Sequence, residues 1–143
     1  MKLWHNGVLT ANVDKTIEFL CAAGGDKSKW TIMEIEFPHE HMVVGNGGKL
    51  RAAFGRAGDS VIELLEPLDD NTYHAIELKK RGPGFHHNAY ICEENMDAVV
   101  KSLLDEGGQI VWEFKRGDEH ACYVQAADKS AVIEIINHCP FMP

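Results

Sequence analysis

The protein has 143 residues, 45% of them apolar, and its formal net charge is −8 with the histidines neutral. A chain of this length suits one domain with a substantial hydrophobic core. Its acidic surface would repel phosphate backbones, which argues against nucleic acid as a partner. No stretch approaches the roughly 20 apolar residues of a membrane helix, and the N-terminus shows no signal-peptide core. We therefore expect a cytoplasmic protein without a membrane partner.

Taken in chain order, the sequence repeats itself. Residues 5–25 and 87–108 both begin with His-Asn, continue through Asn-(Val/Met)-Asp and end with Gly-Gly. Further along, residues 60–65 (SVIELL) match residues 131–136 (AVIEII). Because two blocks recur in the same order, an internal duplication explains the sequence better than chance does.

Each copy predicts a short apolar strand, an amphipathic helix and three further strands, which makes a βαβββ module. Asn12 and Asn95 are the predicted N-caps of the two helices, and the two Gly-Gly pairs are predicted to end them. The later strands are predicted at about residues 30–37, 49–55 and 60–66, and again at about 109–114, 120–126 and 131–137.

The predicted fold class is α+β, with one domain over residues 1–143. Module one covers about residues 1–68 and module two about residues 84–138. The linker between them, residues 69–83, is predicted to carry a short helix at about residues 74–80.

The four cysteines form no C-x-x-C pair, which argues against a zinc clasp. In a reducing compartment they are predicted to be small buried hydrophobic residues and not disulfides. They are Cys21, Cys92, Cys122 and Cys139.

Glu63 stands in a predicted strand that is apolar on both faces. Val61 and Leu65 share its face, and a strand of this kind is normally buried. A buried carboxylate costs several kcal/mol unless it has a partner or a proton. Glu134 repeats this situation between Val132 and Ile136, so the two carboxylates are predicted to share one purpose.

Two histidines complete the set, one at the start of each module. His5-Asn6 matches His87-Asn88, so the repeat selects His87 over its neighbour His86. A lone histidine on an apolar strand is more often a core residue than a ligand, but two histidines and two glutamates related by one repeat reverse that balance.

The set His5, Glu63, His87 and Glu134 therefore predicts a site for one divalent ion. Two imidazoles and two carboxylates suit Zn, Ni, Co, Mn or Fe. The run from His39 to His41 also has the composition of a metal motif. It follows Pro38 in a loop-like stretch and has no counterpart in the second copy, so we predict that it is solvated surface.

Paired βαβββ modules that each supply one His and one Glu resemble the vicinal oxygen chelate superfamily, which includes glyoxalase I, methylmalonyl-CoA epimerase, extradiol dioxygenases and bleomycin resistance proteins. The resemblance implies a curved eight-stranded sheet that forms a metal-binding cleft, and a homodimer. The run ELLEPL at residues 63–68 and the run GPGFHH at residues 82–87 look most like methylmalonyl-CoA epimerase. The N-terminal sequence looks like glyoxalase I, although Leu9 stands where that family has an arginine.

The resemblance implies a metal-dependent epimerase or isomerase that removes a proton next to a carbonyl group held by the metal ion. Glu134 is the expected acid/base residue, and Glu63 could serve on the opposite side. The expected partner is a small-molecule substrate, with an acyl thioester as one candidate. Two alternatives stay open: a glyoxalase I-type lactoylglutathione lyase, and a non-catalytic protein that binds a drug or metabolite. An extradiol dioxygenase fits less well, because its two-His, one-carboxylate site leaves Glu63 unexplained.

Overall fold

The structure is a computed structural model, and it describes residues 1–138, so Cys139 lies outside the described residues. The first half contains one α-helix and five strands: β1 (Lys2–Leu9), α1 (Val13–Ala22), β2 (Thr31–Phe37), β3 (Met42–Val44), β4 (Gly48–Ala57) and β5 (Ser60–Pro67). A connecting helix and the second half follow: α2 (Tyr73–Arg81), β6 (Gly84–Ile91), α3 (Met96–Asp105), β7 (Gln109–Arg116), β8 (Glu119–Gln125) and β9 (Val132–Ile136).

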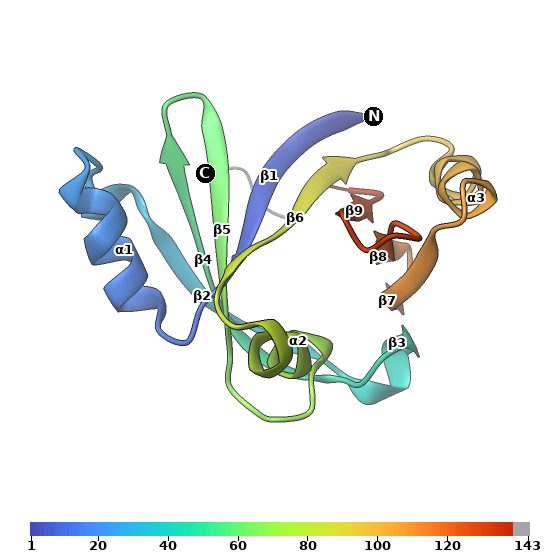
Figure 1. Ribbon diagram of the computed structural model, residues 1–143, viewed down its shortest axis with the longest axis horizontal. Helices are drawn as coiled ribbons and strands as arrows, with labels where there is room; N and C mark the ends of the chain where they lie inside the picture. The colour runs from blue at the N-terminus through green and yellow to red at the C-terminus, as the bar shows by residue number, and fades with distance from the viewer. Residues whose placement is uncertain (139–143) are drawn as a thin grey trace.

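The strands form one continuous sheet that curls into a half-barrel (Figure 1), in the order β2-β4-β5-β1-β6-β9-β8-β7-β3. β1 and β6 pair antiparallel at its centre and join the two halves. Within each half, the first strand pairs parallel with the last, β1 with β5 and β6 with β9. The α+β class and the two βαβββ modules of the sequence prediction are thus confirmed.

The predicted count of eight strands is wrong, because the described residues form nine. The additional strand is β3, which pairs antiparallel with the edge strand β7 and places Met42 opposite Phe114. It has only three residues, too few to show the alternating pattern by which a strand is recognised in a sequence. β3 carries a segment of the first half across to the free edge of the second half.

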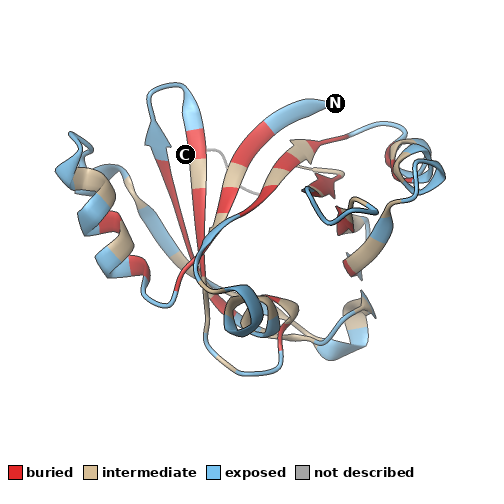
Figure 2. Ribbon diagram, in the orientation of Figure 1, coloured by how far each residue is buried: buried red, intermediate tan, exposed pale blue. Residues whose placement is uncertain are grey.

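The helices α1 and α3 cover the outer face of the sheet, one on each half. Val13 and Ile17 of α1 pack against Ala53 and Leu64 of the sheet. α3 packs in the same way against β8 and β9. The outward faces of both helices are exposed, whereas the buried residues gather on the strands (Figure 2). No helix in residues 1–138 is long and apolar enough to cross a membrane.

The two helix N-termini differ, although the sequence predicts the same cap for both. The Asn12 side chain accepts a hydrogen bond from the Lys15 backbone N–H, as predicted. Asn95 is also an N-cap residue, but it has a left-handed backbone with φ of 60° and its side chain makes no capping hydrogen bond. The extra residue of the second copy falls here, and asparagine is one of the few residues that tolerate this conformation.

Two of the three cysteines in residues 1–138 are buried as predicted, and the third is not fully buried. Cys92 and Cys122 are buried, Cys21 is half-buried, and all three are free thiols. Burial raises the pKa of the Cys122 thiol to about 12, which keeps it protonated and inert.

Candidate metal centre

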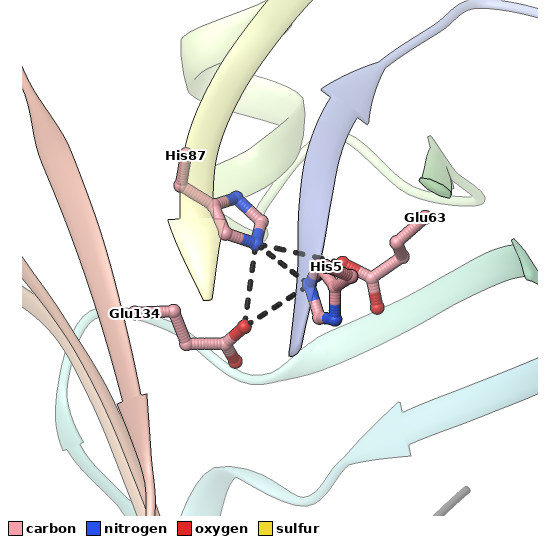
Figure 3. Close-up of side chains that lie close together, drawn as sticks. All are labelled: His5, Glu63, His87 and Glu134. Atoms are coloured by element: carbon pink, nitrogen blue, oxygen red, sulfur yellow. Dashed lines mark hydrogen bonds and ion pairs between the residues drawn. The ribbon is translucent and has the colours of Figure 1, made fainter. Parts of the chain in front are cut away.

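The four predicted ligands come together on the concave face of the sheet, where its four central strands meet. His5 lies on β1, Glu63 on β5, His87 on β6 and Glu134 on β9, and their side chains point toward one another (Figure 3). One potential ligand atom from each residue lies within 4.8 Å of the others.

Strand register places the two carboxylates equivalently in the two halves. Gly7, two residues after His5, pairs with Glu63. Ala89, two residues after His87, pairs with Glu134. The residues two positions before and after each glutamate lie on the same strand face and are buried in the concave core. Each carboxylate is therefore surrounded by apolar side chains of its own strand. The duplication therefore positions the ligands as well as the strands.

The two imidazole Nε2 atoms are the centre of the cluster and lie 3.1 Å apart. The Nε2 atom of His5 is 3.0 Å from Glu63 Oε2 and 3.4 Å from Glu134 Oε2. The Nε2 atom of His87 is 3.6 Å from Glu63 Oε2 and 3.3 Å from Glu134 Oε2. All five distances between neighbouring ligand atoms thus fall in one narrow range.

Four of these five distances match the spacing that a shared divalent ion requires, and the distance from His87 Nε2 to Glu63 Oε2 is slightly longer. Two ligand atoms that each lie about 2.1 Å from an ion, at the angles of tetrahedral or octahedral coordination, are roughly 3.0–3.4 Å apart. Both imidazoles also direct the same nitrogen, Nε2, at the common point. The residues present therefore fit a divalent ion.

Two buried atoms of the cluster have no hydrogen-bond partner. One is Glu134 Oε2, which accepts no hydrogen bond even though both Nε2 atoms lie within ion-pair distance of it. The other is Nδ1 of His5. A carboxylate oxygen left without a partner away from water is costly, and coordination to a cation would satisfy it.

The charges of the cluster depend on one another. Burial opposes protonation of His5, but the carboxylates of Glu63 and Glu134 outweigh it and raise the pKa of His5 to about 10. Burial likewise opposes ionisation of Glu134, but the two imidazoles beside it hold its pKa below the ordinary range. In the metal-free protein a proton on His5 thus supplies the positive charge that a bound cation would supply.

Gly7 allows the two central strands to approach at the site. It pairs with His87 across the β1–β6 contact, and a Cβ atom at this position would overlap the His87 ring. The equivalent position in the other half is Ala89, opposite His5, where a methyl group is accommodated. Glycine is therefore required in only one of the two repeats.

His86 contacts the Nδ1 atom of His87, the ring nitrogen that does not face the cluster. The sequence did not predict this contact. The Nδ1 atoms of the two residues are 2.9 Å apart, and the other nitrogen of His86 lies 3.0 Å from the Tyr73 hydroxyl of α2. Burial lowers the pKa of His86 to about 2, so its ring is neutral and can accept a hydrogen bond. When His87 binds an ion through Nε2, its Nδ1–H must donate, and His86 Nδ1 is there to accept.

The run from His39 to His41 stands apart from this cluster. It forms a single turn of 3-10 helix before β3, where His39 and Glu40 are exposed and His41 is half-buried. The candidate ligand group in residues 1–138 includes none of the three.

A cavity of about 250 Å³ opens beside the cluster on the concave face. The two carboxylates, Glu63 and Glu134, line it, whereas His5 and His87 do not. Most of the remaining wall is apolar or aromatic, including Phe54 of β4. A molecule in this cavity would meet the carboxylates directly.

Comparison with known proteins agrees with this fold. A model of the glyoxalase/bleomycin resistance protein/dioxygenase superfamily matches residues 4–125, and the chain belongs to that superfamily. Among curated proteins, the uncharacterized protein YqjC of Bacillus subtilis is 31% identical over 85 residues. That match spans 59% of this chain and 59% of YqjC.

Among solved structures, the hypothetical protein BH1468 from Bacillus halodurans is similar at a TM-score of 0.66 and 20% identity, covering 99% of this chain and 97% of that one. Methylmalonyl-CoA epimerase from Mycobacterium tuberculosis is similar at a TM-score of 0.64 and 24% identity, covering 97% and 89%. Streptomyces coelicolor methylmalonyl-CoA epimerase, in complex with 2-nitronate-propionyl-CoA, is similar at 0.63 and 23%, covering 95% and 96%. At these identities the likeness shows the fold.

Replacing Gly7 with alanine tests the close approach of the strands. The added methyl group should displace the His87 ring and weaken binding of a divalent ion by at least about tenfold, as measured by calorimetric titration of the metal-free protein. Ala89→Gly, the reverse change at the equivalent position, should leave the affinity nearly unchanged. Equal affinities in Gly7→Ala and the unmodified protein would contradict the geometry described for His87.

The raised pKa of His5 predicts how the stability of the metal-free protein depends on pH. The native state holds a proton that the unfolded chain releases near its ordinary pKa of 6.5. This contribution to stability is complete below pH 6.5 and is lost as pH rises toward about 10. The free energy of unfolding, from urea titrations in the presence of a chelator, should fall over this interval.

His5→Gln provides the control for this dependence. The variant lacks the titrating imidazole, so its unfolding free energy should vary much less between pH 6.5 and 10. The same slope in both proteins would show that His5 is not the group responsible.

Proposed function

We propose that the protein is a divalent-metal-dependent epimerase or isomerase that removes and returns a proton next to the carbonyl of a small substrate. The observation that carries this proposal is the placement of two carboxylates from equivalent strands, Glu63 and Glu134, on the wall of one cavity. An ion held by His5, Glu63, His87 and Glu134 would polarise the carbonyl oxygen and so acidify the neighbouring C–H bond.

Glu134 is the proposed base. Its carboxyl group faces the cavity, and in the metal-free protein the imidazoles beside it already hold its pKa below the ordinary range. As the C–H bond breaks, the proton passes to the Glu134 carboxylate and the electron pair passes to the carbonyl oxygen. Return of a proton to the same carbon completes the exchange.

Glu63 gives the site a second carboxyl group on a different strand. For inversion of the carbon, a proton must leave on one face and arrive on the other, so one carboxyl group starts ionised and the other protonated. The parallel pairings that hold Glu63 next to Gly7 and Glu134 next to Ala89 keep the two groups on opposite halves of the sheet. The imidazoles between them separate the two carboxylates.

A glyoxalase-type lyase is the alternative with the same residues. It would move a proton between two adjacent carbons of a hemithioacetal, for which one carboxylate suffices. Leu9, where the resembling family has an arginine, is fully buried in the concave core, so this residue offers no charge to a glutathione carboxylate. The epimerase reaction therefore agrees better with the chain.

Exchange of the substrate hydrogen with D₂O tests the proposal. The metal-loaded protein should wash deuterium into the carbon next to the carbonyl of a 2-substituted acyl thioester, as followed by mass spectrometry. Glu134→Gln keeps an oxygen that can bind a metal ion but removes the base, so exchange should fall by about 10²–10⁴-fold.

Glu113→Gln is the matched control. Glu113 is also a buried glutamate, but it pairs with His120 and Lys115 and lies outside the cavity wall. This variant should exchange at the unmodified rate. Exchange that survives in Glu134→Gln would remove Glu134 from the mechanism, and turnover of a hemithioacetal without any thioester exchange would favour the lyase.

A further inference from the structure

We infer that the cavity beside Glu63 and Glu134 selects a substrate whose reacting half is uncharged and largely apolar, such as an alkyl- or aryl-substituted acyl group. A substrate with a second free carboxylate next to the reacting carbon is disfavoured. The reaction itself rests on the proposed function, but the selection rests on the composition of the cavity wall.

Most of the residues that line the cavity are apolar. Met33, Ile35 and Phe37 project from β2, and Trp112 and Phe114 project from β7. Apart from one tyrosine and two tryptophans, the lining residues with a polar side chain are four: Glu63, His74, Glu119 and Glu134. Apolar surface of this extent binds alkyl and aryl groups by the hydrophobic effect.

Nothing among the described residues that line the cavity offers a positive charge to an anion. None of them is a lysine or an arginine. His74 is neutral, because burial lowers its pKa to about 3, and its Nε2 atom is 2.8 Å from the Tyr123 hydroxyl. The ionisable groups that remain in the wall are carboxyl groups.

Arg116 is a cation close to one wall, but it is already engaged. Its guanidinium lies over the ring of Phe114, and it pairs with Glu119 at 2.8 Å. Its side chain is half exposed to water, which weakens any field that it projects into the cavity. The opposite charges of Glu119 and Arg116 therefore largely cancel at this wall.

A free carboxylate in the substrate would thus lose its hydration without gaining an ion pair. An uncharged carbonyl compound avoids this penalty.

The size of the cavity limits what it encloses. Its volume of about 250 Å³ lies below the range of roughly 300–1,000 Å³ that is usual for drug-sized ligands. It can therefore enclose the acyl half of a thioester, while a large thiol handle would remain outside. The acyl group is the part on which selectivity should depend.

Two probe thioesters with one common handle test the inference: N-acetylcysteamine thioesters of 2-phenylpropionate and of methylmalonate. Each is titrated into the metal-loaded full-length protein, and binding is followed through tryptophan fluorescence, since Trp4 and Trp112 line the cavity. Deuterium exchange is measured on the same samples. The phenylpropionyl ester should bind at least about tenfold more tightly.

The outcomes separate this inference from the proposed function. Tighter binding of the phenylpropionyl ester supports the inference, whether or not deuterium exchange occurs. If this ester binds tightly but does not exchange, the result counts against the proposed reaction and leaves the inference supported. Equal or tighter binding of the methylmalonyl ester would overturn the inference, and so would the absence of binding by either ester. If the methylmalonyl ester binds as tightly or more tightly and exchanges deuterium, the proposed proton-transfer reaction would still be supported.

A charge placed in the wall gives a second test. Met33→Arg adds a cation on the cavity face of β2 and should reduce the preference for the phenylpropionyl ester by at least about tenfold. Ile32→Arg makes the same charge change at the neighbouring residue, which is exposed and does not line the cavity. It should leave the preference unchanged. The same preference in both variants would show that the charge of the wall does not select the ligand.

Discussion

Two carboxylates and two imidazoles share one point on the concave face of the sheet, almost without contact with water. Like charges in such a position repel, and each ionised group has lost its hydration. The cluster is stable only if positive charge enters it, either as a proton on the imidazoles or as a cation bound by all four residues. This constraint explains the raised pKa of His5, the lowered pKa of Glu134 and the partnerless Glu134 oxygen.

The remainder of the fold serves to hold these four groups in place. The antiparallel contact between β1 and β6 brings the histidines of the two repeats together, and the parallel partners β5 and β9 bring the glutamates. Helices on the outer face leave the concave face free for an aromatic wall. A ligand that fills the cavity would exclude water from the carboxylates, which would strengthen the electrostatic interactions between them and the ligand.

The sequence predicted much of this arrangement because the chain is duplicated. A single buried glutamate between Val61 and Leu65 could be explained in several ways. Because Glu134 stands at the equivalent position of the second repeat, a shared role for the two carboxylates is the better explanation. The same comparison distinguished His87 from His86. The strand positions and the left-handed glycines Gly24 and Gly107 also followed from local patterns.

What the sequence could not predict depends on contacts between distant residues. β3 exists because the edge of β7 is available to it, and no local pattern shows this. The contact between His86 Nδ1 and His87 Nδ1 breaks the repeat symmetry, since no histidine precedes His5. The apolar part of the cavity wall likewise comes mostly from β2, β4, β7 and β8, and most of their inward residues are ordinary core residues in sequence.

Metal content and coordination, measured together, test the central claim most directly. Elemental analysis with X-ray absorption spectroscopy of the purified protein should give about one divalent ion per chain, bound only by nitrogen and oxygen. His87→Ala should abolish this binding, whereas His39→Ala should retain it. Full occupancy in His87→Ala, or sulfur in the coordination shell, would contradict the assignment of His5, Glu63, His87 and Glu134 as the metal centre.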